Sequence, residues 1–90
     1  MKYRVVTSRE TDRELRRMPR RELERTNRIL LALGENPLPR GTKKLQGTDS
    51  TWRVRMGEYR IIYSVDDTNQ QLIVEDILRR TSQTYRRRRR

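Results

Sequence analysis

The stretch that decides the fold is Trp52-Arg-Val-Arg-Met-Gly-Glu-Tyr-Arg-Ile-Ile-Tyr63. Its first half alternates apolar with cationic side chains. This period of two is typical of a β-strand and sends Arg53 and Arg55 to the same face of a sheet. The Gly57-Glu58 dipeptide favours a tight turn, and the second half is rich in β-branched and aromatic residues. The stretch therefore predicts a β-hairpin with two arginines side by side on one face.

The same pattern continues toward the C-terminus. Residues 59 to 65 predict the second strand of the hairpin, residues 66 to 70 predict another turn, and residues 71 to 78 predict a third strand. Because short turns join consecutive strands, the three strands are expected to form an antiparallel meander.

The residues ahead of the hairpin predict one strand and two helices. Residues 2 to 7 are partly β-branched, and Thr7-Ser-Arg-Glu10 has the spacing of a capping box that begins a helix over residues 8 to 18. Pro19 stops that pattern and is expected in the first turn of a second helix with a broad leucine-rich face. Gly34 is expected to cap the C-terminus of this helix.

This order of elements predicts an α+β fold in which an N-terminal strand and a helical hairpin pack on one face of a small antiparallel sheet. The other sheet face is left for solvent or a ligand. A chain of 90 residues has room for one core, so we expect a single domain over residues 1 to 85, followed by a basic tail over residues 86 to 90.

The charge of the chain points to a polyanionic partner. The formal net charge is +11, and 20 of the 23 cationic residues are arginine. Guanidinium is planar, permanently charged and bidentate toward phosphate, so this composition favours nucleic acid, with RNA as the first candidate. The alternative is a solvated basic surface, although self-repulsion of this size needs compensation.

The residue types that are missing exclude several classes of chemistry. The sequence has no cysteine and no histidine, which excludes disulfides, a thiol nucleophile and the usual zinc sites. We therefore expect no cofactor and no metal. No apolar run approaches the roughly 18 to 20 residues that cross a bilayer, and the N-terminus lacks an apolar signal core. We expect no contact with a membrane and a cytoplasmic location.

Five arginines of the predicted strands form a candidate phosphate site. Neighbouring strands lie about 4.8 Å apart, so side chains on one face could converge on one or two phosphate groups. Two lysines ahead of the sheet could extend the patch; the alternative is that exposed strand positions are often charged. The arginines are Arg53, Arg55, Arg60, Arg79 and Arg80, and the lysines are Lys43 and Lys44.

Cleavage of RNA without a metal would need more than arginines. The 2′-hydroxyl must lose a proton and the leaving 5′-oxygen must gain one, whereas guanidinium keeps its proton at ordinary pH. Tyr85, which follows a pair of arginines and precedes the terminal run, is the first acid–base candidate, because nearby cations favour its ionised form. Glu58 and Glu75 could act as bases, although a carboxylate among arginines is more often an ion-pair partner. The remaining aromatic residues are expected in the core or on the sheet: Tyr3, Tyr59, Tyr63 and Trp52.

Taken together, these residues resemble the RelE/ParE superfamily of toxins from bacterial and archaeal toxin–antitoxin modules. The resemblance covers nearly the whole chain, and its central stretch is the most specific part. It rests on Arg13-Glu-Leu-Arg-Arg-Met-Pro19, Asn36-Pro37, Lys43-Lys-Leu-Gln-Gly47, the stretch from Trp52 to Tyr63, and Ile77-Leu-Arg-Arg80 followed by Tyr85.

The resemblance implies a ribosome-dependent mRNA interferase of the RelE branch, an endoribonuclease that cleaves mRNA in the ribosomal A site by 2′-hydroxyl attack. It implies that Arg60 and Arg80 clamp the scissile phosphate, Arg53 and Arg55 stabilise developing charge, and Tyr85 assists proton transfer. Lys43, Lys44 and Arg79 would bind RNA. Many relatives have lysine in place of Arg53 and Arg55, and histidine in place of Arg79, so the usual proton carriers are replaced.

The resemblance also implies the partners of the chain. These are a cognate antitoxin protein, the ribosome and mRNA. Two other functions stay open at this point: a ParE-like inhibitor of DNA gyrase, which shares the motifs around residues 43 to 47 and 59 to 63, and a non-catalytic basic module that binds RNA.

Overall fold

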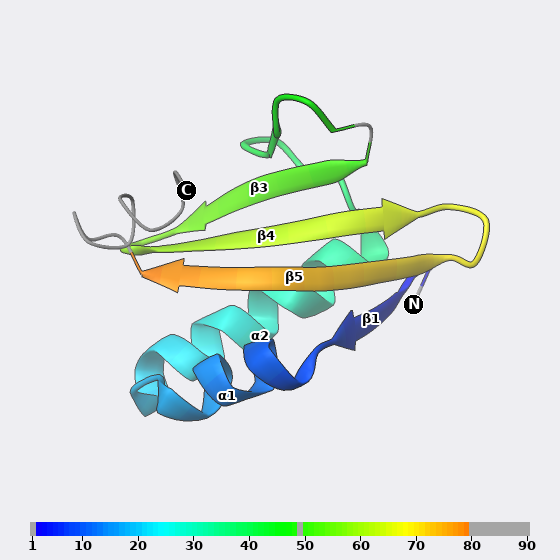
Figure 1. Ribbon diagram of the computed structural model, residues 1–90. Coiled ribbons are helices and arrows are strands. Elements are labelled where there is room, and N and C mark those ends of the chain that lie inside the picture. The colour runs from blue at the N-terminus through cyan, green and yellow to red at the C-terminus, as the bar shows by residue number, and fades with distance from the viewer. Residues whose placement is uncertain (1, 49, 80–90) are drawn as a thin grey trace.

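The computed structural model describes residues 2–48 and 50–79. Two helices lie on one side of a five-stranded sheet (Figure 1). The predicted order of strand, two helices and three consecutive strands is confirmed, with one short additional strand ahead of the meander. The elements are β1 (Arg4–Thr7), α1 (Arg9–Arg17), α2 (Arg20–Glu35), β2 (Lys43–Lys44), β3 (Thr51–Met56), β4 (Tyr59–Asp66) and β5 (Gln71–Arg79).

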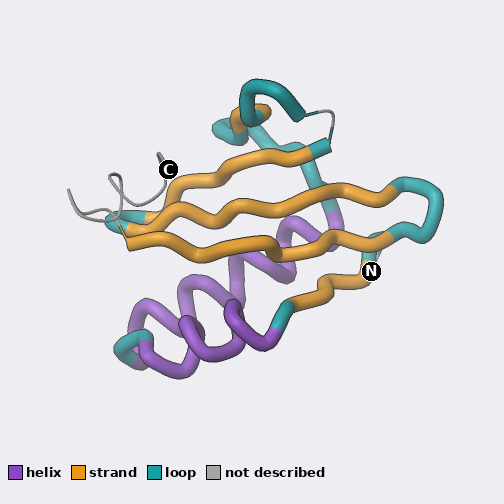
Figure 2. Tube along the Cα trace, viewed as in Figure 1, coloured by secondary structure: helices purple, strands orange, loops and turns teal. Residues whose placement is uncertain are grey.

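The strands are ordered β1-β5-β4-β3-β2 across the sheet (Figure 2). The meander of β3, β4 and β5 is antiparallel as predicted, and β2 continues it at one edge. β1 joins the other edge and runs parallel to β5, so the complete sheet is mixed. A parallel pair cannot be joined by a tight turn, and the chain between these two strands includes both helices. Within the described residues, no helix is long and apolar enough to cross a bilayer.

The capping box of α1 lies one residue later than predicted. Ser8 is the N-cap: its Oγ accepts a hydrogen bond from the backbone of Thr11 at 3.1 Å, and Thr11 Oγ1 accepts one from the backbone of Ser8 at 2.8 Å. Thr7 cannot take this role because it still belongs to β1, where it pairs with Val74. The prediction of Thr7 as the cap was wrong because pairing in the sheet decides where the strand ends.

The prediction of Gly34 as the cap of α2 was also wrong. The helix continues to Glu35, and the backbone of Asn36 donates to Ala32 at 2.9 Å as the C-cap. Gly34 is buried, and its carbonyl accepts a hydrogen bond from the backbone of Tyr3 at 2.9 Å. This glycine therefore lies where the N-terminal segment approaches the helix backbone. At the other end, Pro19 is the N-cap of α2 and precedes its first turn.

The core lies between the helices and the sheet. Five of its residues are at most 1% exposed: Leu33 from α2, Ile61 and Tyr63 from β4, and Leu72 and Val74 from β5. The predictions that Tyr3, Tyr59, Tyr63 and Trp52 belong to the core or the sheet are confirmed, since Tyr63 is buried and the other three pack against the core.

Tyr63 anchors the loop after α2 to the sheet. Its hydroxyl donates a hydrogen bond of 2.5 Å to the carbonyl oxygen of Pro37. Because the phenol is buried, the pKa of Tyr63 is raised from its ordinary value to about 12. This contact fixes the segment that leads toward β2.

Candidate nucleic-acid interface

A cluster of four cations lies on the sheet face opposite the helices. Trp52 and Val54 pack toward the core, so the alternating residues Arg53 and Arg55 point to the other face. Directly opposed residues of an antiparallel pair share a face, and Arg55 is paired with Arg60 while Arg53 is paired with Lys43. We call this face the open face, and the cluster the cationic patch; its members are Lys43, Arg53, Arg55 and Arg60.

The patch suits a phosphate group. Side chains that oppose each other directly across an antiparallel pair have Cβ atoms about 4.5 to 5.5 Å apart, and like charges at that spacing repel. A bound anion removes this repulsion, and guanidinium offers two parallel N–H donors to phosphate. The three arginines come from two adjacent strands, so the backbone ladder holds their Cα atoms in a fixed arrangement.

The apolar side chain of Ile62 lies between charged residues on the open face. Ile62 lies on this face because its neighbours Ile61 and Tyr63 enter the core, yet it is only 6% exposed. Its directly opposed residues are Arg53 on β3 and Asp76 on β5. The low exposure is consistent with long charged side chains that lay their aliphatic stems across it.

A β-bulge changes which side chains of β5 reach the open face. Ile62 pairs with Asp76 while Tyr63 pairs with Val74, so Glu75 is an extra residue on β5. Glu75 accepts a hydrogen bond from the hydroxyl of Ser64, an open-face residue, which places Glu75 on that face as well. Alternation in the sequence does not predict this bulge, because no glycine or proline indicates its position.

Arg79 lies on the opposite side of the sheet from the cationic patch. It pairs with Tyr59, which packs against the core, and it lines two hollows beside the helices together with residues of both. The predicted convergence of Arg79 with the strand arginines is therefore wrong. The physical reason is the bulge, which shifts the alternation of β5 by one residue.

The two lysines of β2 also separate. Lys43 opposes Arg53 on the open face, whereas Lys44 opposes Trp52, a residue that packs against the core. The Nζ atom of Lys44 lies 6.0 Å from the centroid of the Trp52 ring, at the limit of a cation–π contact. Lys44 thus covers the indole and does not extend the patch.

The remaining predicted site residues are Glu58 and the C-terminal residues. Glu58 lies in the turn between β3 and β4, where it lines a hollow with Arg25 and Arg79 on the helix side. Arg80, Tyr85 and residues 86 to 90 lie outside the described residues, so their roles stay predictions.

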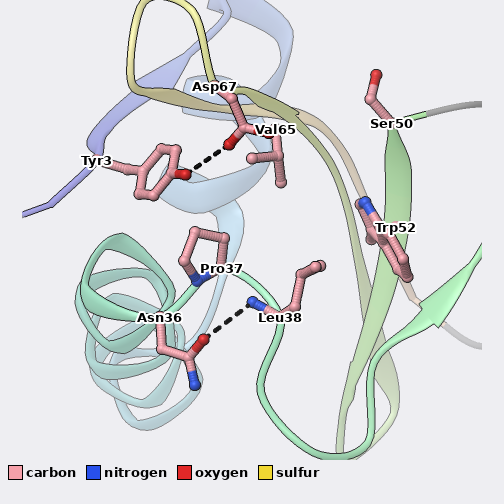
Figure 3. Close-up of a pocket in the computed structure, with 8 residues that line it drawn as sticks. All are labelled: Tyr3, Asn36, Pro37, Leu38, Ser50, Trp52, Val65 and Asp67. Carbon is pink, nitrogen blue, oxygen red and sulfur yellow. Dashed lines mark hydrogen bonds between the residues drawn. The ribbon is translucent and has the colours of Figure 1, made fainter.

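A separate cavity of about 240 Å³ lies on the helix side, near the start of β3 (Figure 3). Its walls are mostly apolar, and Tyr3 donates a hydrogen bond of 2.5 Å to Asp67 at its rim. That hydrogen bond raises the pKa of Tyr3. The lining holds a carboxylate and no lysine or arginine, so it suits an apolar side chain better than a phosphate. The lining residues are Tyr3, Asn36, Pro37, Leu38, Ser50, Trp52, Val65 and Asp67.

The helical hairpin on one face of a small mixed sheet matches the fold of a solved RelE-like structure. Residues 5–84 match the model of the ParE toxin of the type II toxin–antitoxin system parDE. The chain therefore belongs to the RelE/ParE family of type II toxins.

Individual relatives agree with this assignment. A protein of Methanocaldococcus jannaschii described as toxin RelE1 is 30% identical over 83 residues, which are 89% of this chain and 92% of that protein. Among solved structures, the archaeal RelE–RelB complex from Pyrococcus horikoshii has a TM-score of 0.82 at 29% identity, covering 91% of this chain and 99% of the other. The toxin–antitoxin complex RelBE2 from Mycobacterium tuberculosis has a TM-score of 0.77 at 27% identity, covering 89% of this chain and 100% of the other.

Proposed function

We propose that this toxin is a metal-independent endoribonuclease that cleaves mRNA in the ribosomal A site and so inhibits translation. The observation that carries the proposal is the cationic patch, in which Arg55 opposes Arg60 on a face that no described helix covers. Three guanidinium groups on two neighbouring strands match the negative charge that develops on the equatorial phosphate oxygens during 2′-hydroxyl attack. Membership of the RelE/ParE family supports the same function.

The proposed roles follow the chemistry of each group. Arg60, together with Arg80, holds the scissile phosphate, while Arg53 and Arg55 stabilise the charge on its equatorial oxygens. Tyr85 assists proton transfer at the leaving 5′-oxygen. Lys43 adds electrostatic attraction to the RNA backbone, which is a salt-dependent contribution.

The proposed partners are an antitoxin protein, the ribosome and mRNA, and the proposed location is the cytoplasm. The Pyrococcus horikoshii and Mycobacterium tuberculosis relatives are both described as complexes of toxin with antitoxin, which supports the first partner. The net charge of +11 supports a polyanionic target and an acidic binding region on the antitoxin. We also propose that residues 1 to 85 form the toxin domain and that residues 86 to 90 add non-specific affinity.

The experiment that tests the function is a brief induction of the toxin in cells, followed by primer extension to map mRNA 5′ ends. We expect cuts within translated frames, and we expect them to disappear in Arg60→Ala. The matched control is Arg21→Ala, which removes the same charge from an exposed position of α2 and should leave the cuts in place. Growth arrest with intact mRNA would contradict the proposed function.

A second function is favoured by one specific observation. The matching family model is that of the ParE toxin, and the alternative is therefore a ParE-like inhibitor of DNA gyrase. This alternative predicts gyrase–DNA complexes trapped on the chromosome of induced cells together with intact mRNA. A toxin that binds RNA without either effect would be a non-catalytic basic module.

A further inference from the structure

We propose that the carboxylate of Asp76 is the base that removes the proton from the attacking 2′-hydroxyl. This inference rests on the proposed endoribonuclease function and names a catalytic residue that the cationic patch by itself does not supply. It is carried by the β-bulge of β5, which brings Asp76 to the open face beside the arginines.

The need for a base follows from the composition of the patch. Arginine keeps its proton at any ordinary pH, and lysine in its usual ammonium form has no lone pair to accept one. The sequence has no histidine and no cysteine. Among the described residues, the groups on the open face near the patch that can accept a proton at neutral pH are the carboxylates of Glu75 and Asp76.

Two other carboxylates near the meander are placed elsewhere. Asp66 ends β4 and accepts hydrogen bonds from the backbone and side chain of Asn69, which close the turn at the far end of the sheet. Glu58 lines the hollow on the helix side with Arg79. Neither lies on the part of the open face where the arginines gather.

The bulge is what directs Asp76 to the patch. Leu72 and Val74 enter the core, so uninterrupted alternation would send residue 76 inward as well. The extra residue reverses the phase, and Ile77 enters the core instead, at 2% exposure. Bulges of this kind commonly re-aim a side chain next to a functional site.

The register places Asp76 close to Arg60. Asp76 opposes Ile62, and Arg60 opposes Leu78, two residues further along β5. Diagonal neighbours of this type on one face lie about 7 to 8 Å apart at the Cα atoms, within reach of long side chains and of a nucleotide held between them. A phosphate bound by Arg55 and Arg60 would therefore bring its adjoining ribose to Asp76.

Local contacts favour Asp76 over Glu75. The backbone N–H of Ile77 donates to Asp76 Oδ1 at 2.9 Å, which orients the carboxylate. Glu75 is exposed and accepts from Ser64, which pairs with Thr51 and lies further from Arg55 and Arg60 along the sheet. A carboxylate has two oxygens with several lone pairs, so other contacts of Asp76 do not prevent it from accepting a proton.

The proposed step balances as follows. Asp76 takes the proton of the 2′-hydroxyl, the 2′-oxygen forms a bond to phosphorus, and the bond between phosphorus and the 5′-oxygen breaks. The 5′-oxygen takes a proton from a water molecule, and the resulting hydroxide takes the proton from Asp76. The products are a 2′,3′-cyclic phosphate and a 5′-hydroxyl, and no oxidant or reductant is needed.

The test is single-turnover cleavage of mRNA on purified ribosomes across a range of pH. Asp76→Asn keeps the shape but cannot act as the base, so we expect the rate to fall by about 100-fold or more while ribosome affinity stays within about threefold. Asp76→Glu should recover part of the rate. Glu75→Gln is the matched control, which removes the adjacent carboxylate and should stay within about threefold of wild type.

The pH dependence separates a base from a residue that only holds Arg60. In wild type we expect the rate to fall on acidification, and this acidic limb should be absent in Asp76→Asn. A variant that is slow but keeps the acidic limb would overturn the proposal. So would a wild-type rate that does not fall on acidification, a test that needs no variant and holds even if Asp76→Asn fails to fold.

Failure of the two proposals can be distinguished. If wild type leaves ribosome-bound mRNA intact, the endoribonuclease function is wrong and the inference falls with it. If wild type cleaves, Arg60→Ala does not, and Asp76→Asn cleaves with an unchanged pH profile, only the assignment of Asp76 is wrong.

Discussion

Arg55 of β3 lies directly opposite Arg60 of β4, so two arginines share one rung on the open face of the sheet. Cross-strand pairs of opposite charge or of apolar side chains stabilise a sheet, and like charges at the same positions destabilise it. The pair therefore contributes a like-charge repulsion that a bound phosphate would offset. Stability and anion binding are in conflict at this pair.

The first prediction is that Arg55→Thr makes the free protein more stable. Threonine is well suited to a strand and removes the repulsion with Arg60, so the free energy of unfolding should rise by about 0.2 to 1 kcal/mol. The measurement is urea denaturation at low salt, repeated at high salt, where screening should shrink the gain. A loss of stability at both salt concentrations would show that Arg55 is held by contacts stronger than the repulsion.

The second prediction concerns the salt dependence of RNA binding. Each phosphate contact that is lost should reduce the slope of log K against log salt by about 0.7 to 0.9. We expect this reduction for Arg53→Gln, measured by fluorescence anisotropy with a short single-stranded RNA. Arg21→Gln on α2 removes the same charge far from the patch, and an equal reduction there would mean that binding is diffuse.

The third prediction is a loss of stability at alkaline pH that depends on Tyr63. The unfolded phenol has a pKa of about 10, and burial raises the pKa in the folded state to about 12. The folded state thus binds more protons between these values, so this contribution is complete below pH 10 and is lost as the pH rises toward 12. Chemical denaturation across this range should show a shallower decline for Tyr63→Phe than for Tyr59→Phe.

The fourth prediction tests the cap of α1. Ser8→Ala removes the acceptor for the backbone of Thr11 and should lower the free energy of unfolding by about 0.5 to 2 kcal/mol. Ser8→Asp retains a capping oxygen at the same position, so its free energy of unfolding should remain within a few tenths of a kcal/mol of the wild-type value. Thermal unfolding of both variants measures these losses of stability. Equal losses for Ser8→Ala and Ser8→Asp would show that the cap hydrogen bond contributes little.

The fifth prediction tests the turn between β3 and β4. Gly57 has a φ of 56°, a left-handed conformation that side chains disfavour. A Cβ atom there would lie 3.5 Å from Arg25 Nη1, an ordinary contact, so the cost of Gly57→Ala is conformational and about 1 kcal/mol. Gly57→Asn should cost less, because asparagine tolerates this region better. Denaturant midpoints would separate the two variants.

The sequence was most informative where local chemistry and periodicity agree. Alternation around Arg53 and Arg55, the Gly57-Glu58 turn and the proline-rich loop after α2 were sufficient to predict the hairpin, the meander and the pairing of Arg55 with the strand that carries Arg60. These features depend on neighbours a few residues apart. The patch was therefore largely predictable before the structure.

The remaining features depend on contacts between distant segments. The bulge at Glu75 has no turn residue to mark it, yet it reverses the facing of Arg79 and brings Asp76 to the open face. The parallel pairing of β1 with β5 and the burial of Gly34 against the N-terminal segment likewise depend on packing between elements that are distant in the sequence. Periodicity within one segment carries no information about such contacts.

The pairing of β1 with β5 has a consequence for the synthesis of the protein. A ribosome makes β1 early and β5 last among the described strands, and β5 lies between β1 and β4 in the sheet. The nascent chain therefore cannot assemble this sheet, or the arrangement of Asp76 beside the arginines, until β5 has emerged. For a toxin whose proposed substrate is held by ribosomes, this order delays activity until β5 has left the ribosome that made it.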